Sequence, residues 1–146
     1  MNDQYEEITV PPTLDGDEYH LATVVRAGFQ LEAPGIRFLT DQAQSLQLAV
    51  MQFPTGHVVP AHRHLSNRRT VDQTQETLIV RTGKVAVSFY RSGGEFVAVR
   101  VLHPGDVVHL LTGGHKVEAL VPSSIMEIKT GPYYGRDKDK VLLEGK

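Results

Sequence analysis

Two histidines and one glutamate are the residues of this chain whose types and spacing are best suited to chemistry. His62 and His64 are separated by one residue in a segment that reads as extended, and Glu76 opens the next apolar run. Because strand side chains alternate between faces, we expect His62 and His64 to project from the same side. Two imidazoles and a carboxylate at adjoining strand ends would form a metal-ligand set of mixed nitrogen and oxygen character.

The glycines around this set complete a pattern that resembles the first sequence motif of the cupins. The motif reads G-x5-H-x-H, a gap, and then E-x6-G, and it is matched by Gly56, His62, His64, Glu76 and Gly83. One feature departs from the family, which usually has a much shorter gap than residues 65–75. A longer hairpin loop need not disturb ligands that are held on strands.

A second stretch, residues 102–115, is similar to the second cupin motif, which carries a third histidine. It contains Pro104-Gly105-Asp106 and ends in Gly113-Gly114-His115. It is one residue shorter than the usual motif, and Leu111 stands where the family has a proline. The resemblance implies that His115 joins His62, His64 and Glu76 as a fourth metal ligand.

The elements that must position these residues read as short strands. Apolar or alternating runs punctuated by Gly and Pro predict strands at 8–10, 19–26, 36–40, 46–53, 76–81, 85–90, 96–102, 107–111, 116–121 and 125–129. No segment has a sustained helical period, although residues 41–45 are suited to one short turn. This pattern indicates an all-β barrel or sandwich.

The cupin resemblance narrows this to a double-stranded β-helix, the jelly-roll barrel of that family. It covers roughly residues 46–140 and implies a barrel core over 46–130 within a single domain spanning 1–146. Residues 1–18, with Pro11-Pro12 and several acidic side chains, read as an N-terminal arm.

Composition sets limits on partners and compartment. The chain has 146 residues, a formal net charge of -2 and no cysteine. This length suits one domain, the charge gives no sign of a nucleic-acid or membrane partner, and disulfides and thiolate metal sites are excluded. The polar, acidic first residues lack the features of a signal peptide and no apolar run is long enough to span a membrane, so we expect a cytoplasmic protein.

Three imidazoles and one carboxylate would bind a divalent transition metal and leave coordination positions open, as catalytic sites do. The sequence does not choose among iron, manganese, nickel, cobalt and zinc. Two of the histidines with Glu76 also resemble the facial triad of non-haem iron oxygenases. A metal-free cupin that uses its barrel as a plain binding cavity is the alternative.

Further candidates surround this set. His57, His109 and Tyr133 are candidate catalytic bases, with ordinary structural roles as the alternative. Arg68, Arg69 and Gln75 lie in the intervening segment, where guanidinium groups would suit a phosphate or carboxylate. A solvated loop with incidental charge is the competing interpretation of that segment.

The segment 127–137, which reads E-I-K-T-G-P-Y-Y-G-R-D, resembles the closing segment of cupin-type mannose-6-phosphate isomerases. We therefore expect a metal-dependent isomerase or epimerase that acts on a sugar or sugar-phosphate-like small molecule. A non-haem iron dioxygenase and a non-catalytic carbohydrate-binding protein are the alternatives. Small cupins commonly pair, so we also expect a homodimer, with the N-terminal arm and outward-facing Ile79 and Ala86 as contacts.

Overall fold

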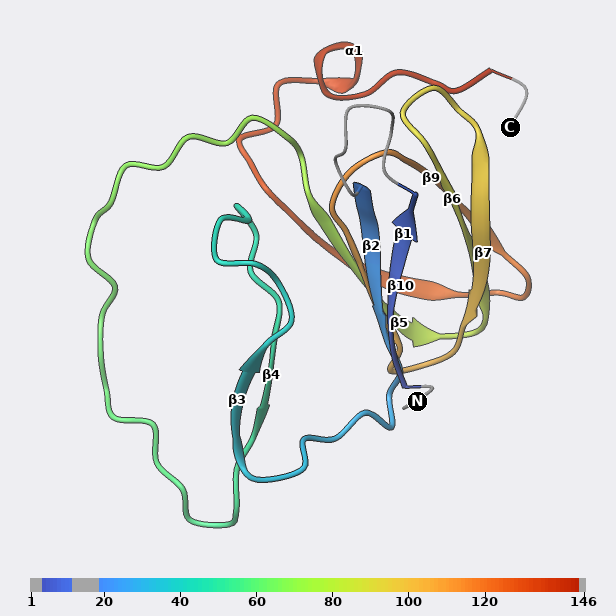
Figure 1. Cartoon of the computed structure of the whole chain (residues 1–146). Coiled ribbons are helices and arrows are strands. Elements are labelled where there is room, and N and C mark those ends of the chain that lie inside the picture. The colour runs from blue at the N-terminus through green and yellow to red at the C-terminus, as the bar shows by residue number, and fades with distance from the viewer. Residues whose placement is uncertain (1–3, 12–18, 145–146) are drawn as a thin grey trace.

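The computed structural model describes residues 4–11 and 19–144, which fold almost entirely into antiparallel strands (Figure 1). The strands are β1 (Tyr5–Val10), β2 (Tyr19–Val25), β3 (Gly35–Phe38), β4 (Ala49–Gln52), β5 (Glu76–Thr82), β6 (Val85–Tyr90), β7 (Phe96–Leu102), β8 (Val107–Leu110), β9 (Gly114–Ala119) and β10 (Ser124–Lys129). A short helix, α1 (Arg136–Asp139), follows β10. Within the described part of the chain, no helix is long and apolar enough to span a membrane.

The strands form three separate sheets. The largest has the order β1-β2-β8-β5-β10, the second has the order β7-β6-β9, and β3 and β4 pair only with each other. The all-β expectation is therefore confirmed. No closed barrel is detected among the described residues, because the strands form three separate sheets and each sheet has two unpaired end strands.

The core lies between the two larger sheets and follows directly from sequence alternation. Val85, Val87 and Phe89 of β6 point inward and are almost fully buried, and Leu78 and Val80 of β5 meet them from the other sheet. Each such side chain contributes about 1.5–3 kcal/mol by leaving water. Residues that pair with these positions on neighbouring strands point toward the same interior. The site residues described below are among them.

The turn before β8 is held by one buried carboxylate. Asp106 accepts hydrogen bonds from the backbone N–H of Ala27 at 2.9 Å, from the backbone N–H of His103 at 2.9 Å and from Arg26 Nη1 at 2.9 Å. Burial acts to raise the pKa of Asp106, but these donors together hold it below its ordinary value. Gly105 has φ +89°, as the third residue of a type II turn requires.

The β3–β4 hairpin lies to one side of the two larger sheets (Figure 1). The loop that joins β3 to β4 is held by the residue before β5, since the side-chain oxygen of Gln75 accepts from the backbone N–H of Leu46 at 2.9 Å. Arg37 lies 5.6 Å from the centroid of the Tyr5 ring on β1. The strand predicted over 46–53 is real but shorter, and the predicted turn near residue 41 is present, with Gln44 N–H donating to the Asp41 carbonyl.

The stretch that carries His62 and His64 is not a strand, and that expectation is wrong. The residues between β4 and β5 contain no strand, and every residue from 53 to 74 is exposed. Pro54 and Pro60 lack the N–H that a ladder requires, and no sheet edge lies alongside to supply partners. The predicted N-terminal strand is confirmed as β1, whereas the rest of the predicted arm, residues 1–3 and 12–18, lies outside the described residues.

Candidate functional site

Glu76 and His115 form the central contact of the candidate site. Glu76 opens β5 on the face that carries Leu78 and Val80, and His115 lies opposite the buried Phe89 on the neighbouring sheet. Both side chains therefore point into the space between the sheets. His115 Nε2 lies 3.1 Å from Glu76 Oε2, with His115 about one-third exposed and Glu76 13% exposed.

The hydrogen bond from His115 holds the pKa of Glu76 below its ordinary value, while burial opposes that shift. Lys129 and Lys140 add a smaller attraction in the same direction as His115. Glu76 is therefore a carboxylate at neutral pH.

A cavity of about 650 Å³ opens beside this pair. Its walls come from both sheets and from the C-terminal segment that crosses the end of the sandwich, and they include Glu76, Tyr90, His115, Val117, Glu127 and Leu143. This volume falls in the range of small-molecule sites. Thr74, Ser92, Lys116 and Lys140 add hydroxyl and ammonium groups to the lining.

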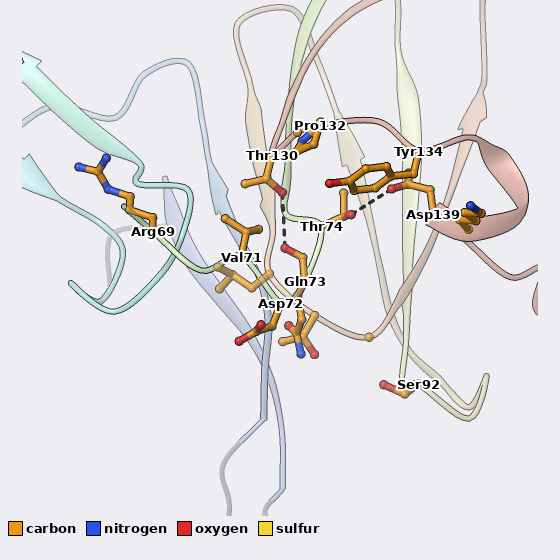
Figure 2. A pocket seen from close by; sticks show the side chains of 15 residues that line it. Arg69, Val71, Asp72, Gln73, Thr74, Ser92, Thr130, Pro132, Tyr134 and Asp139 are labelled. Atoms are coloured by element: carbon orange, nitrogen blue, oxygen red, sulfur yellow. Dashed lines mark hydrogen bonds between the residues drawn. The ribbon is translucent and has the colours of Figure 1, made fainter. Parts of the chain in front are cut away.

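A second cavity of about 700 Å³ adjoins the first and shares Thr74, Thr112 and Asp139 with it. Figure 2 shows its lining, in which Thr74 hydrogen-bonds to Asp139 and the Thr130 hydroxyl donates to the Gln73 carbonyl. Asp139 Oδ2 also lies 3.6 Å from Lys129 Nζ. These contacts fix α1 and the following residues over the end of the sandwich.

His62 and His64 lie together but apart from this pair. Their ring centroids are 5.3 Å apart, and His62 Nδ1 donates to the Pro60 carbonyl at 2.8 Å. Across residues 4–11 and 19–144, no group of three or more His, Asp or Glu side chains is placed to hold a metal ion. The structure therefore brings together two of the four expected ligands, Glu76 and His115, and leaves the other two on the exposed segment.

The candidate bases lie outside the cavity. His109 is fully buried on the opposite face of β8 from Val108 and Leu110, and its Nδ1 hydrogen-bonds with the Thr77 hydroxyl at 2.8 Å. Burial lowers the pKa of His109. His57 stacks on Phe53, with the ring centroids 4.1 Å apart.

The remaining candidates are distributed over several environments. Arg69 lines the second cavity (Figure 2), whereas Arg68 is exposed. Gln75 is buried, and its side chain bonds to Gln44, Ser45 and Leu46, which is a structural task in this structure. Tyr133 is exposed with Lys129 Nζ 5.0 Å from its ring centroid, and its neighbour Tyr134 lines the second cavity.

Sequence reasoning missed Glu127 as a cavity residue. Glu127 lies opposite Leu78 in the register of β10 and β5, so it shares the interior face of the sheet. The signal was available, because Ile125 and Glu127 fall on one face of a strand and Ile125 packs against the core. Tyr90 and Asp139 were missed as well, and no local pattern marks them as cavity residues.

Chemically, the arrangement offers an ionised carboxylate and an imidazole at hydrogen-bond distance, facing a cavity lined by both polar and apolar side chains. Such a pair can transfer protons to and from a bound molecule. It also supplies two of the donors that a divalent cation requires.

Comparisons with known proteins identified no relative of this chain. No protein-family model, no curated protein and no solved structure matches the chain.

Proposed function

We propose that this chain is a jelly-roll protein of the cupin type that binds a polar, carbohydrate-like small molecule between its sheets and isomerises or epimerises it. The observation that carries the proposal is the Glu76–His115 contact, at 3.1 Å, on the interior face of a cavity of about 650 Å³. Support for the jelly roll comes from two antiparallel sheets facing each other across a core.

The lining suits a ligand with many hydroxyl groups. Thr74, Ser92 and Thr112 contribute hydroxyls, Glu127 and Asp139 contribute carboxylates, and Lys116 and Lys140 contribute amines. Hydroxyl and carboxylate side chains form the short hydrogen bonds by which sugars are oriented, and an ammonium group attracts a phosphate as a point charge. A sugar or sugar phosphate, which has hydroxyl groups as well as C–H faces, therefore suits a cavity whose lining also includes apolar side chains such as Val117, Leu142 and Leu143.

In the reaction we propose, Glu76 removes a proton from the carbon next to a carbonyl, and His115 donates a proton to the carbonyl oxygen. The resulting enediol returns its other hydroxyl proton to His115 and takes the proton held by Glu76 onto the neighbouring carbon. Both side chains end in their starting states and the product is an isomer of the substrate. Glu76 can accept the proton because it is ionised at neutral pH and faces the cavity.

A divalent metal is the cofactor that the motif resemblance implies, and it would polarise the carbonyl oxygen when bound. Within one chain the ligands do not fit it, since His62 and His64 lie on the exposed segment and away from Glu76 and His115. The facial triad of an iron dioxygenase would need the same residues to meet. We therefore assign no step of the reaction to a metal.

The test is a proton-exchange and isomerisation assay on a panel of aldoses, ketoses and their phosphates in deuterated water. We expect one substrate to incorporate deuterium at the carbon next to its carbonyl, and we expect Glu76→Gln to abolish that exchange. Glu118→Gln is the matched control, because Glu118 lies on β9 opposite Ala86 and points away from the core. Equal loss in both variants, or no exchange with any sugar, would contradict the proposal.

A binding protein without turnover is the second candidate. It is favoured because the cavity gathers a carboxylate–imidazole pair, Glu76 and His115, and the described residues hold no cluster of three or more metal-ligating side chains. A sugar that raises the melting temperature of the wild type but undergoes no exchange would identify this case.

A further inference from the structure

The two cavities at this end of the sandwich share a wall. The residues that line both include Thr74, Thr112, Gly113 and Asp139. The Thr74 hydroxyl donates to Asp139 Oδ1 at 3.2 Å, so these two side chains meet at the boundary. A ligand that is longer than one cavity would extend from the first into the second past this pair.

The strand that carries Glu76 leads from the first cavity to the shared wall. Gln75 turns its side chain to Leu46 in the loop between β3 and β4, so by strand alternation Thr74 and Glu76 face the other side. Two residues of extended chain separate them by about 7 Å, which is comparable to the length of one sugar unit. The two cavities are therefore spaced like neighbouring units of a glycan.

The charges around the second cavity favour a neutral ligand there. Its charged lining residues are two cations and two anions: Arg69, Lys138, Asp72 and Asp139. A phosphate is bound best where guanidinium or ammonium groups are not opposed by carboxylates. Gln73 and Thr130 add an amide and a hydroxyl group, which hydrogen-bond to neutral hydroxyls in either direction.

Tyr134 gives the second cavity a flat apolar surface. Its side chain is 71% exposed and is drawn among the lining residues in Figure 2, together with Thr74 and Asp139. Its neighbour Tyr133 lines neither of these cavities, and Lys129 Nζ lies 5.0 Å from the centroid of that ring. An aromatic ring packs on the C–H face of a sugar, while the phenol hydroxyl reaches a polar edge.

We propose that the substrate is a reducing disaccharide or the reducing end of a longer glycan. Its reducing unit lies beside Glu76 and His115, and its next unit lies against Tyr134 in the second cavity. Only the reducing unit opens to a free carbonyl, which decides the end that meets the carboxylate–imidazole pair. The placement of that end rests on the proposed isomerisation, whereas the second subsite depends on binding alone.

The first test is calorimetric titration of the wild type with reducing sugars of one and two units: glucose against maltose, cellobiose and lactose, and mannose against mannobiose. We expect at least one disaccharide to bind on the order of tenfold more tightly than the monosaccharide at its reducing end. Equal affinity within every pair, or no binding of any sugar, would overturn the proposal.

The second test assigns that gain to a residue. Tyr134→Ala should remove the gain and leave the affinity for the monosaccharide unchanged, and Tyr134→Phe should keep it because the ring remains. Tyr133→Ala is the matched control, since Tyr133 is the adjacent tyrosine, is 60% exposed and lies outside both cavities. An undiminished gain in Tyr134→Ala, or an equal loss in Tyr133→Ala, would contradict the second subsite.

A sugar phosphate and the deuterium-exchange assay separate the remaining cases. If glucose-6-phosphate binds more tightly than every disaccharide and Lys138→Ala removes that difference, the second cavity holds a phosphate and the proposal is wrong. A disaccharide that binds with the Tyr134-dependent gain but exchanges no deuterium would support the second subsite and contradict the isomerisation. Exchange in a monosaccharide with no gain from any disaccharide would overturn the second subsite alone.

Discussion

Two buried carboxylates of this chain should respond very differently to neutralisation. Asp106 accepts three hydrogen bonds from its own chain, two of them from backbone N–H groups, and its side chain is 6% exposed. Among the described residues, Glu76 hydrogen-bonds to the side chain of His115, which is about one-third exposed, and it is attracted more weakly by Lys129 and Lys140. If Asp106 stabilises the fold and Glu76 contacts a ligand, replacing Asp106 should lower the free energy of unfolding strongly, and replacing Glu76 should lower it little.

The magnitudes follow from the partners that each substitution leaves unsatisfied. In Asp106→Asn the amide offers one acceptor oxygen to donors on two sides, so at least one buried donor is orphaned and we expect a loss of about 2–3 kcal/mol. In Glu76→Gln the amide oxygen still accepts from His115, and water reaches that ring, so we expect a loss below about 1 kcal/mol.

The assay is guanidinium unfolding at pH 7, repeated as the pH is lowered. The folded-state pKa of each carboxylate is depressed, so each contributes stability that is present above the unfolded value, about 4, and is lost as the pH falls through the folded pKa. The difference between wild type and Asp106→Asn should therefore shrink below about pH 4. A Glu76→Gln variant that is as unstable as Asp106→Asn at pH 7 would refute the assignment of Glu76 to a ligand.

The remaining predictions concern the surroundings of the site. Burial depresses the pKa of His109, so the unfolded chain takes up a proton before the folded chain does as the pH falls below about 6.5. The free energy of unfolding should therefore decrease below that pH. In His109→Gln the urea midpoint should depend less steeply on pH. Gln75→Ala should lower the free energy of unfolding by about 1–3 kcal/mol and speed amide hydrogen exchange at residues 44–46. Unchanged exchange there would contradict the role of Gln75 in holding the loop between β3 and β4. Asp139→Asn should lower the free energy of unfolding by less than about 1 kcal/mol, yet it should speed amide hydrogen exchange across residues 136–144. Unchanged protection of these residues would show that the Asp139 contacts with Thr74 and Lys129 do not hold this segment in place. Because His62 lies on the exposed segment and apart from Glu76 and His115, His62→Ala should leave the metal content of the protein, measured by elemental analysis, equal to that of the wild type, and a clearly lower content would show that this segment supplies a ligand.

The strands of the two larger sheets could be predicted from the sequence because their signal is local. In β6, Val85, Val87 and Phe89 alternate with smaller or polar residues, and Gly83 marks the turn before it. A side chain at Gly83 would place its Cβ 2.4 Å from the Pro122 carbonyl oxygen, so the turn and its neighbour pack too closely for any other residue. The expected link between Glu76 and His115 depended on the motif resemblance, and the structure brings the two side chains into contact.

The segment between β4 and β5 could not be predicted in the same way. The spacing of His62 and His64 favours a strand locally, but a strand needs a neighbouring edge, and nothing in residues 53–75 says where that edge is. Gln75 is predicted to bind substrate because it lies in the segment between the expected ligand strands, whereas its side chain bonds to residues some thirty positions earlier in the chain. Both differences arise from contacts distant in sequence, which local patterns do not contain.

The end of the sandwich beside the Glu76–His115 cavity differs from the rest because polar residues stand on the interior face of its strands. Glu76 follows the alternation of Leu78 and Val80, Glu127 lies opposite Leu78, and His115 lies opposite Phe89, so all three occupy interior positions. A fully buried apolar side chain contributes about 1.5–3 kcal/mol to folding, so the largest part of this loss falls at Glu76, whose side chain is 13% exposed, and less of it at the more exposed His115 and Glu127. Polar residues at apolar-face positions around one cavity contribute little to the stability of the sheets, which is the pattern that the proposed ligand site requires.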